Sequence, residues 1–212
     1  MHPTMIECIR GFPYRIRRGV RQFSERTCAS AIQRCLRRYE PSTNASPLEI
    51  YLLDVRRAVR VGSAFSAISL ALALPDICGS IEYPEEDRVW KRYADWCDVW
   101  ARGLISLESP DCYALRCAYL HNGTGSFSGS SAEYSKIFNE VHFTSGKSGG
   151  VWIHRAVPSP RGGLDATMRA QVPYDDFCHS MTGAAMGWWM KRKDDERVSR
   201  AVNDLMRLSP PA

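Results

Sequence analysis

The segment of residues 109–123, SPDCYALRCAYLHNG, constrains the fold more than any other, because it has a marked start, a marked end and an apolar interior. Ser109 is a good N-cap, Pro110 suits the first helical turn, and Asp111 lies where the helix dipole favours an anion. The Asn-Gly pair at the end of the segment is a typical left-handed stop. The sequence therefore predicts one short helix with both ends defined.

Apolar residues occupy every face of this predicted helix, as in a helix that is buried all round. Arg116 and His121 interrupt the apolar pattern. A guanidinium in such surroundings needs a partner, so the pair requires either structural contacts or a function. Asp76 is the best candidate to neutralise Arg116, and Glu82 is the alternative; His121 can also be a plain helix cap.

The composition is that of a globular protein rather than a disordered or fibrous one, with 44% hydrophobic and 24% charged residues in a chain of 212. The eight cysteines are scattered and form no CxxC pair, which favours a reducing cytoplasm and predicts no structural zinc. The N-terminus lacks the apolar centre of a secretory signal. The longest apolar run, residues 64–74, is too short to span a bilayer. We therefore expect a cytoplasmic protein that does not associate with membranes.

Positive charge is concentrated in an arm, residues 1–42, which holds nine arginines against three glutamates. Four of these arginines are closely spaced: Arg15, Arg17, Arg18 and Arg21. Such a cluster can bind nucleic-acid phosphates without reading the sequence, and the alternatives are a poorly ordered extension or residues added by an over-long gene model. Residues 43–47 have linker composition, so we expect the main domain to span residues 48–208.

The periodicity of the main domain predicts a mainly α fold with a small β insertion. Apolar residues at helical spacing indicate one long helix over residues 48–74, stopped or kinked at Pro75, and a second helix over residues 85–104. Short alternating segments within residues 136–172 predict a small antiparallel sheet. Residues 173–208 have the pattern of one long C-terminal helix.

No cofactor is indicated by the sequence. His142 and His154 could align on neighbouring strands as metal ligands, but no third ligand is identifiable, and a polar strand face is the favoured explanation. We expect no metal site.

Arg116 and His121 are a minimal set for cleaving RNA without a metal. Histidine can accept and give protons near neutral pH, and arginine can hold a phosphate with two parallel hydrogen bonds. In that reaction the 2′-hydroxyl attacks its own phosphorus, and the protein supplies proton transfer and charge stabilisation. However, residues five apart are separated by about 140° around an ideal helix, so they are not expected to lie side by side on one face.

The Arg-x4-His pattern, on an apolar helix that follows two long helices, resembles the motif of the HEPN domain, an all-helical nucleotide-binding and ribonuclease module. Residues 74–79 and 112–117 also look like those of a group of uncharacterised bacterial HEPN-like proteins, and the resemblance covers roughly residues 48–205. It implies an antiparallel helical bundle and a homodimer through facing motif helices, in which Arg116 of one chain could serve beside His121 of the other. Active members usually carry a polar residue directly after the arginine, and here that residue is Cys117.

Two functional hypotheses follow from the sequence. The first is a HEPN-like RNA-binding protein and metal-independent endoribonuclease that leaves 2′,3′-cyclic phosphate ends. Arg116 and His121 are then catalytic, and Asp76, Cys117 and Asn122 support them. The resemblance also implies a defence or toxin–antitoxin setting with a cognate antitoxin. The second hypothesis is a catalytically inactive dimerisation module in which Arg116 is structural. A third route to nucleic acid, through the arginine arm alone, is independent of both.

Overall fold

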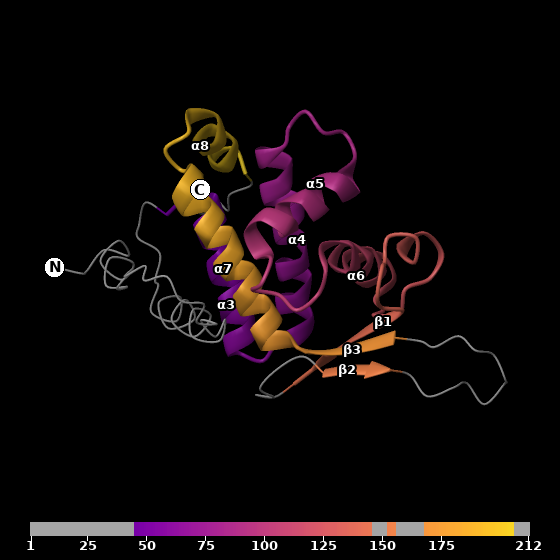
Figure 1. Ribbon diagram of the computed structural model, residues 1–212. Coiled ribbons are helices and arrows are strands. Elements are labelled where there is room, and N and C mark those ends of the chain that lie inside the picture. Colours follow the sequence, from indigo (N-terminus) through magenta and orange to yellow (C-terminus); the bar gives the residue numbers. More distant parts are fainter. Residues whose placement is uncertain (1–44, 146–151, 156–167, 206–212) are drawn as a thin grey trace, which may run out of the picture. The chain divides into compact units, whose positions relative to one another are not determined.

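The computed structural model describes residues 45–145, 152–155 and 168–205, which belong to one compact unit, Pro41–Ala212 (Figure 1). The predicted arm, with Arg15, Arg17, Arg18 and Arg21, lies outside the described residues. The elements follow in this order along the chain: α3 Pro47–Arg60, α4 Ala64–Glu82, α5 Val89–Trp96, a π-helical turn Cys97–Ala101, α6 Ser109–Asn122, a 3-10 turn Gly129–Ser131, β1 Glu140–Thr144, β2 Trp152–Arg155, β3 Met168–Pro173, α7 Tyr174–Arg192 and α8 Glu196–Asn203. The prediction of a mainly helical fold with a small sheet before the C-terminal helical region is confirmed.

The prediction of a single long helix over residues 48–74 is wrong, because the chain forms two helices there. Helix α3 begins at a capping box in which Ser46 and Glu49 satisfy each other's backbone N–H groups, so the last two residues of the expected linker belong to the helix start. It ends before Gly62, whose φ of 74° is left-handed. Glycine adopts that conformation at little cost, and the chain turns sharply into α4.

Helix α4 continues through Pro75, so the helix does not stop there as one of the two expected outcomes had it. Proline removes a backbone donor and disturbs the preceding turn. In that region the Tyr51 hydroxyl donates to the carbonyl of Leu70, at 3.1 Å. The packing of α4 against its neighbouring helices favours a continuous helix and outweighs the local tendency of proline to interrupt it. Among the described residues, α4 is the helix long and apolar enough to cross a membrane by composition, and half of it is buried inside the bundle.

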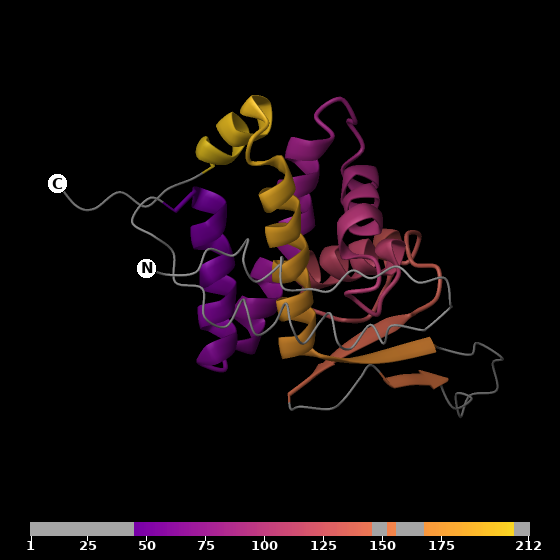
Figure 2. The same ribbon diagram turned by 60° about the vertical axis from the view of Figure 1, so that its left-hand side comes forward.

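Helix α7 packs against both α3 and α4, and α4, which also contacts α5, α6 and α8, forms the centre of the bundle (Figures 1 and 2). The large residues that are almost completely buried come from these helices, from α5 and α6, and from β1 and α8, and they include Leu48, Leu52, Leu72, Leu74, Trp96, Leu115, Val141, Met181, Trp188 and Val198. Glu82 at the end of α4 accepts hydrogen bonds from Trp188, at 2.9 Å, and from Arg192. These bonds join the C-terminal ends of α4 and α7, which run antiparallel to α3 in the views shown.

The expected single helix over residues 173–208 is likewise interrupted. Helix α7 ends at Arg192, and Asp195 caps a new helix, α8, by accepting from the backbone N–H groups of Arg197 and Val198. An aspartate is a strong N-cap, and here it starts a second helix inside a continuous charged stretch. Arg197 then donates to the carbonyl of Ile81, which attaches α8 to the end of α4.

The expected helix over residues 85–104 forms only from Val89, and its last turn widens into the π-helical segment Cys97–Ala101. Helix α5 crosses α4 closely at Gly79. A Cβ at that position would lie 2.9 Å from the carbonyl oxygen of Arg92. The glycine therefore allows the backbone of α5 to pack closely against α4.

The small sheet is mixed rather than antiparallel, with strand order β1-β3-β2. Strand β1 pairs with β3 in parallel, and β2 pairs with β3 antiparallel. Because β3 lies between the other two strands, His142 and His154 are not on neighbouring strands, which corrects the expected alignment. His142 is paired with Gln171, and His154 with Arg169. The described residues contain no group of three or more metal-ligating side chains.

Candidate active site

Helix α6 forms from Ser109 to Asn122, as the sequence predicts, and the left-handed residue that ends it is Gly123, with a φ of 66°. The N-cap is shifted by one residue from the prediction. Glu108 occupies the cap, while Ser109 is buried and its hydroxyl donates to Asp98 at 2.6 Å. The hydroxyl is thus used for a tertiary contact rather than for capping.

Arg116 and Asp76 form the expected ion pair. The Nε of Arg116 donates to Oδ2 of Asp76 at 2.7 Å, and the two side chains are 19% and 21% exposed. Glu82, the alternative partner, binds Trp188 and Arg192 instead. The pair joins the middle of α6 to α4 and fixes the plane of the guanidinium at a partly exposed position.

His121 lies against the same guanidinium within one chain. The distance from Nη1 of Arg116 to Nε2 of His121 is 3.0 Å. The expectation that the two side chains cannot lie side by side is therefore wrong. The angle of about 140° describes where side chains leave the helix, whereas the long arginine side chain reaches around it to the last turn. No second chain is needed to bring the two groups together.

The geometry of this contact sets its direction. Arginine N–H groups only donate hydrogen bonds, so Nη1 of Arg116 is the donor and Nε2 of His121 the acceptor, which fits the tautomer with its ring N–H on Nδ1. Asp76, Arg116 and His121 thus form a linear chain of contacts from α4 to the exposed end of α6.

Only one of the two carboxylate oxygens of Asp76 accepts a hydrogen bond within the described part of the chain. Its Oδ1 atom is buried and has no hydrogen-bond partner among the described residues. Burial raises the pKa of Asp76 by more than the hydrogen bond and the charge of Arg116 lower it. For Arg116, burial lowers the pKa, but the hydrogen bond and the attraction to Asp76 outweigh it, so the pKa is raised and the guanidinium remains charged.

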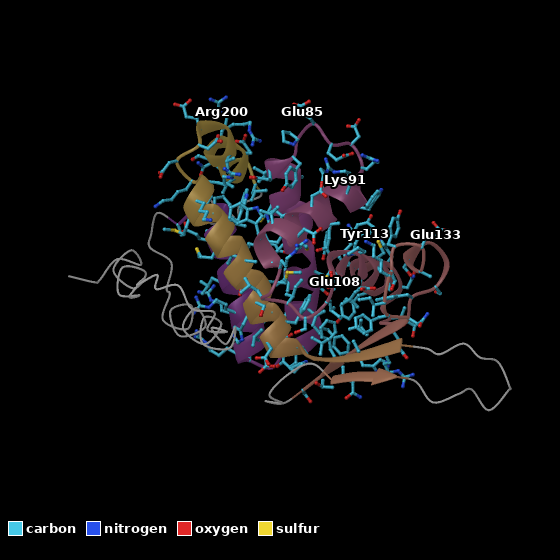
Figure 3. The ribbon with its side chains drawn as sticks, in the orientation of Figure 1. Glu85, Lys91, Glu108, Tyr113, Glu133 and Arg200 are labelled. Carbon is cyan, nitrogen blue, oxygen red and sulfur yellow. The ribbon has the colours of Figure 1, made fainter. Side chains whose placement is uncertain are left out.

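Aromatic rings hold the other side of Arg116. Its guanidinium carbon lies 6.0 Å from the ring centre of Tyr113, which also contacts the rings of Tyr93 and Tyr134 at 5.3 and 4.8 Å. Figure 3 labels Tyr113 on α6, in the region next to α5. A cation over an aromatic face is attracted to it, and edge-to-face ring pairs have defined geometry. The rings therefore limit the positions that Arg116 can adopt.

Asp111 in the first turn of α6 organises the loop that supports these rings. Its carboxylate is fully buried, and Oδ1 accepts from the Ser135 hydroxyl at 2.6 Å and from the backbone N–H groups of Lys136, Ile137 and Phe138 at 3.0, 3.2 and 3.4 Å. The helix dipole predicts an anion at this position, but it does not predict these tertiary contacts. The partners lie 24 to 27 residues away, and no sequence spacing indicates them.

The two other supporting residues from the sequence lie beside the chain of contacts. Cys117 is partly exposed and interacts with both Arg116 and Tyr113. Asn122 is exposed and is the last residue of α6. Arg92, which the sequence analysis did not single out, adds its positive charge near Asp76 from the neighbouring helix α5.

Comparison with known proteins gives no relative: no family model, no curated protein and no solved structure matches the chain.

Replacing Asp76 by asparagine tests the electrostatics of the pair. The pKa of Asp76 is higher in the folded protein than in the unfolded chain, so its contribution to the free energy of unfolding is fully present below the unfolded pKa, about 4, and is lost as the pH rises through the folded pKa. The asparagine does not titrate. We therefore expect the stability of the wild type, relative to Asp76→Asn, to decrease from about pH 3 to pH 7 in urea unfolding experiments. A relative stability that increases over this range would contradict the assignment.

Proposed function

We propose that this protein is a HEPN-like, metal-independent endoribonuclease whose catalytic pair is Arg116 and His121. The observation that carries the proposal is the contact chain from Asp76 through Arg116 to His121, with 2.7 and 3.0 Å between its members. It puts a fixed guanidinium and an exposed imidazole within reach of one phosphate. The helical fold and the resemblance of the Arg-x4-His motif agree with the proposal.

The chemistry assigns a separate role to each residue. Asp76 holds the Nε edge of Arg116, so the terminal nitrogens remain directed toward His121 and solvent. A bound phosphate replaces His121 as the acceptor of Nη1, because a charged oxygen is a stronger acceptor than an imidazole nitrogen. Nε2 of His121 then becomes free to remove the proton of the attacking 2′-hydroxyl. Arg116 stabilises the charge that develops on the phosphorane. The P–O5′ bond then breaks, and His121 returns the proton to the leaving 5′-oxygen, which gives a 5′-hydroxyl and a 2′,3′-cyclic phosphate.

The partners in this proposal are RNA, a second copy of the chain and a cognate antitoxin. Dimerisation through the motif helices is part of the HEPN resemblance, and so is the defence or toxin–antitoxin setting in the cytoplasm. Since the contact between Arg116 and His121 forms within one chain, the dimer in this proposal aligns two complete catalytic pairs.

A second candidate function is an inactive interaction module. The specific observation in its favour is that the pair between Arg116 and Asp76 also serves as a link between α6 and α4, a structural role that needs no substrate. Cys117, at the position where active HEPN members carry a polar residue, agrees with this candidate.

Cleavage of a mixed pool of transfer and messenger RNA in excess EDTA distinguishes the two functions. Compared with wild type, His121→Ala and Arg116→Ala are each expected to reduce cleavage by roughly 10²- to 10⁴-fold, the range for losing a positioned acid–base or charge-stabilising group. The products of the wild type should carry 2′,3′-cyclic phosphate ends. Arg57→Ala is a matched control, because Arg57 is an exposed arginine that also pairs with an aspartate.

Each outcome of this test has a defined meaning. Cleavage lost in both site variants and kept in Arg57→Ala supports the ribonuclease. No cleavage by folded wild-type protein supports the interaction module instead. Equal cleavage by all four proteins indicates a contaminating nuclease and removes the evidence for activity.

A further inference from the structure

A cavity that includes none of the three residues of the catalytic chain lies at the C-terminal end of α6. It is a cavity of about 450 Å³ between the start of α4, the end of α6 with the loop that follows it, and β1. Ligand pockets usually measure about 300–1,000 Å³, so the cavity has room for a ligand of nucleotide size. The catalytic chain of Asp76, Arg116 and His121 does not use this cavity.

The walls of the cavity combine aromatic rings with fixed polar groups. Its rings belong to Phe65, Tyr119, Phe143 and Tyr174. Tyr119 and Phe143 are in edge-to-face contact, with 6.2 Å between ring centres. Phe65, in contrast, is 79% exposed, which leaves a large apolar ring available to a flat ligand. Aromatic rings attract nucleobases of any sequence, because every base has a π face.

The polar end of the cavity is preorganised around Glu140. Its carboxylate accepts from Ser126 at 3.2 Å and contacts His142 and Arg169. Burial raises the pKa of Glu140, but the hydrogen bonds from His142 and Arg169 outweigh it and lower the pKa overall. The group is therefore a charged acceptor held in one place, and together with His142 it supplies the polar contacts that a base edge needs.

The start of α4 favours a negative charge at the rim of the cavity. Its first two residues, Ala64 and Phe65, line the cavity. The first turn has no acidic residue, and the N-cap Ser63 makes no capping hydrogen bond. The positive end of the helix dipole is therefore not compensated there, which suits a phosphate attached to a bound base.

Helix α4 connects this cavity to the catalytic pair. Asp76 follows Phe65 by eleven residues, which corresponds to about 16 Å along a helix. A single RNA strand bound with its phosphate at Arg116 can follow α4 toward the cavity. Bases in a duplex are stacked and paired, so only an unpaired base can enter such a cavity.

We propose that this cavity binds an unpaired nucleobase of the RNA strand whose phosphate is cleaved at Arg116 and His121. The assignment of the strand to RNA rests on the proposed ribonuclease function, whereas the assignment of the cavity to a nucleotide rests on its own rings, polar groups and helix end. The substrate class is single-stranded RNA, with Phe65 as the stacking residue. The protein then selects unpaired regions of RNA for cleavage.

The test measures binding of the four 5′-mononucleotides separately to the full chain by saturation-transfer NMR. We expect base protons to receive saturation in the wild type and Phe65→Ala to weaken binding about tenfold. Val61→Ala is the matched control, because Val61 is 77% exposed just before α4 and does not line the cavity.

The outcomes separate this inference from the proposed function. Weakened binding in Phe65→Ala but not in Val61→Ala supports the cavity assignment, even if the EDTA cleavage test fails. Equal binding by both variants, or no binding of any mononucleotide to the wild type, overturns the cavity assignment and leaves the cleavage result to decide the function by itself. Circular dichroism of the two variants verifies that both are folded.

Discussion

Replacement of Asp111 by alanine is expected to lower the free energy of unfolding by about 3 kcal/mol or more, because it removes the acceptor of four hydrogen bonds at once. Three of the donors are backbone N–H groups of one loop, two in partly buried hydrogen bonds and that of Phe138 in a buried one. A buried donor without a partner costs roughly 1–3 kcal/mol. The loop also carries Tyr134, whose ring packs on Tyr113. We therefore expect the loop to detach from α6 and the packing beside Arg116 to loosen.

Urea unfolding and amide hydrogen exchange measure the two parts of this prediction. In Asp111→Ala, the N–H groups of Lys136, Ile137 and Phe138 should exchange much faster than in the wild type. Asp111→Asn retains an acceptor oxygen and should lose less stability. Glu133→Ala, an exposed residue of the same loop, should change stability by less than about 0.5 kcal/mol. A loss below about 1 kcal/mol in Asp111→Ala would show that the carboxylate does not hold the loop.

Replacement of Gly125 by alanine is expected to have a similarly large effect. A Cβ at Gly125 would lie 1.9 Å from the carbonyl oxygen of Val141, which is backbone and cannot rotate away. The carbonyl of Gly125 also accepts from the N–H of Val141 at 2.9 Å, so relieving the clash breaks this bridge. Overpacking of this kind costs typically 1–3 kcal/mol, and the lost hydrogen bond adds to it.

Gly187 provides the matched control for Gly125. It lies inside α7, where a Cβ would meet nothing within 4 Å. Alanine is favoured over glycine in a helix interior by roughly 0.5–1 kcal/mol, so Gly187→Ala should raise the midpoint of urea unfolding while Gly125→Ala lowers it. If the two midpoints moved in the same direction, the close approach of Gly125 to the carbonyl of Val141 would not explain the effect of Gly125→Ala.

Local signals in the sequence predicted the elements better than their boundaries. The motif helix was correct almost to the residue, because proline, aspartate and an Asn-Gly pair act within one turn of where they stand. Errors arose where tertiary packing decides. Pro75 is tolerated because α4 is packed along its length, and Asp195 starts a new helix inside a stretch whose periodicity looks continuous.

The candidate site was also predicted only in part, because local signals identify its residues but not all of their contacts. Arg116 and His121 stood out because polar residues interrupt an apolar helix, and polarity alone suggested Asp76 as the partner of Arg116. The contact between Arg116 and His121 was missed because helical angles do not include side-chain length. The parallel pairing of β1 with β3 was missed because alternation shows which residues share a face but not the direction of the neighbouring strand.

The hydrogen bonds of Glu82 to Trp188 and Arg192 also matter for the synthesis of the protein. They join residues 106 and 110 positions apart, and α7 covers α4, the helix that is apolar enough to cross a membrane. At roughly 5–20 residues per second, the ribosome needs on the order of 5–20 s to add the segment between them. During that interval α4 lacks the cover that α7 provides, so its apolar surface is open to chaperones.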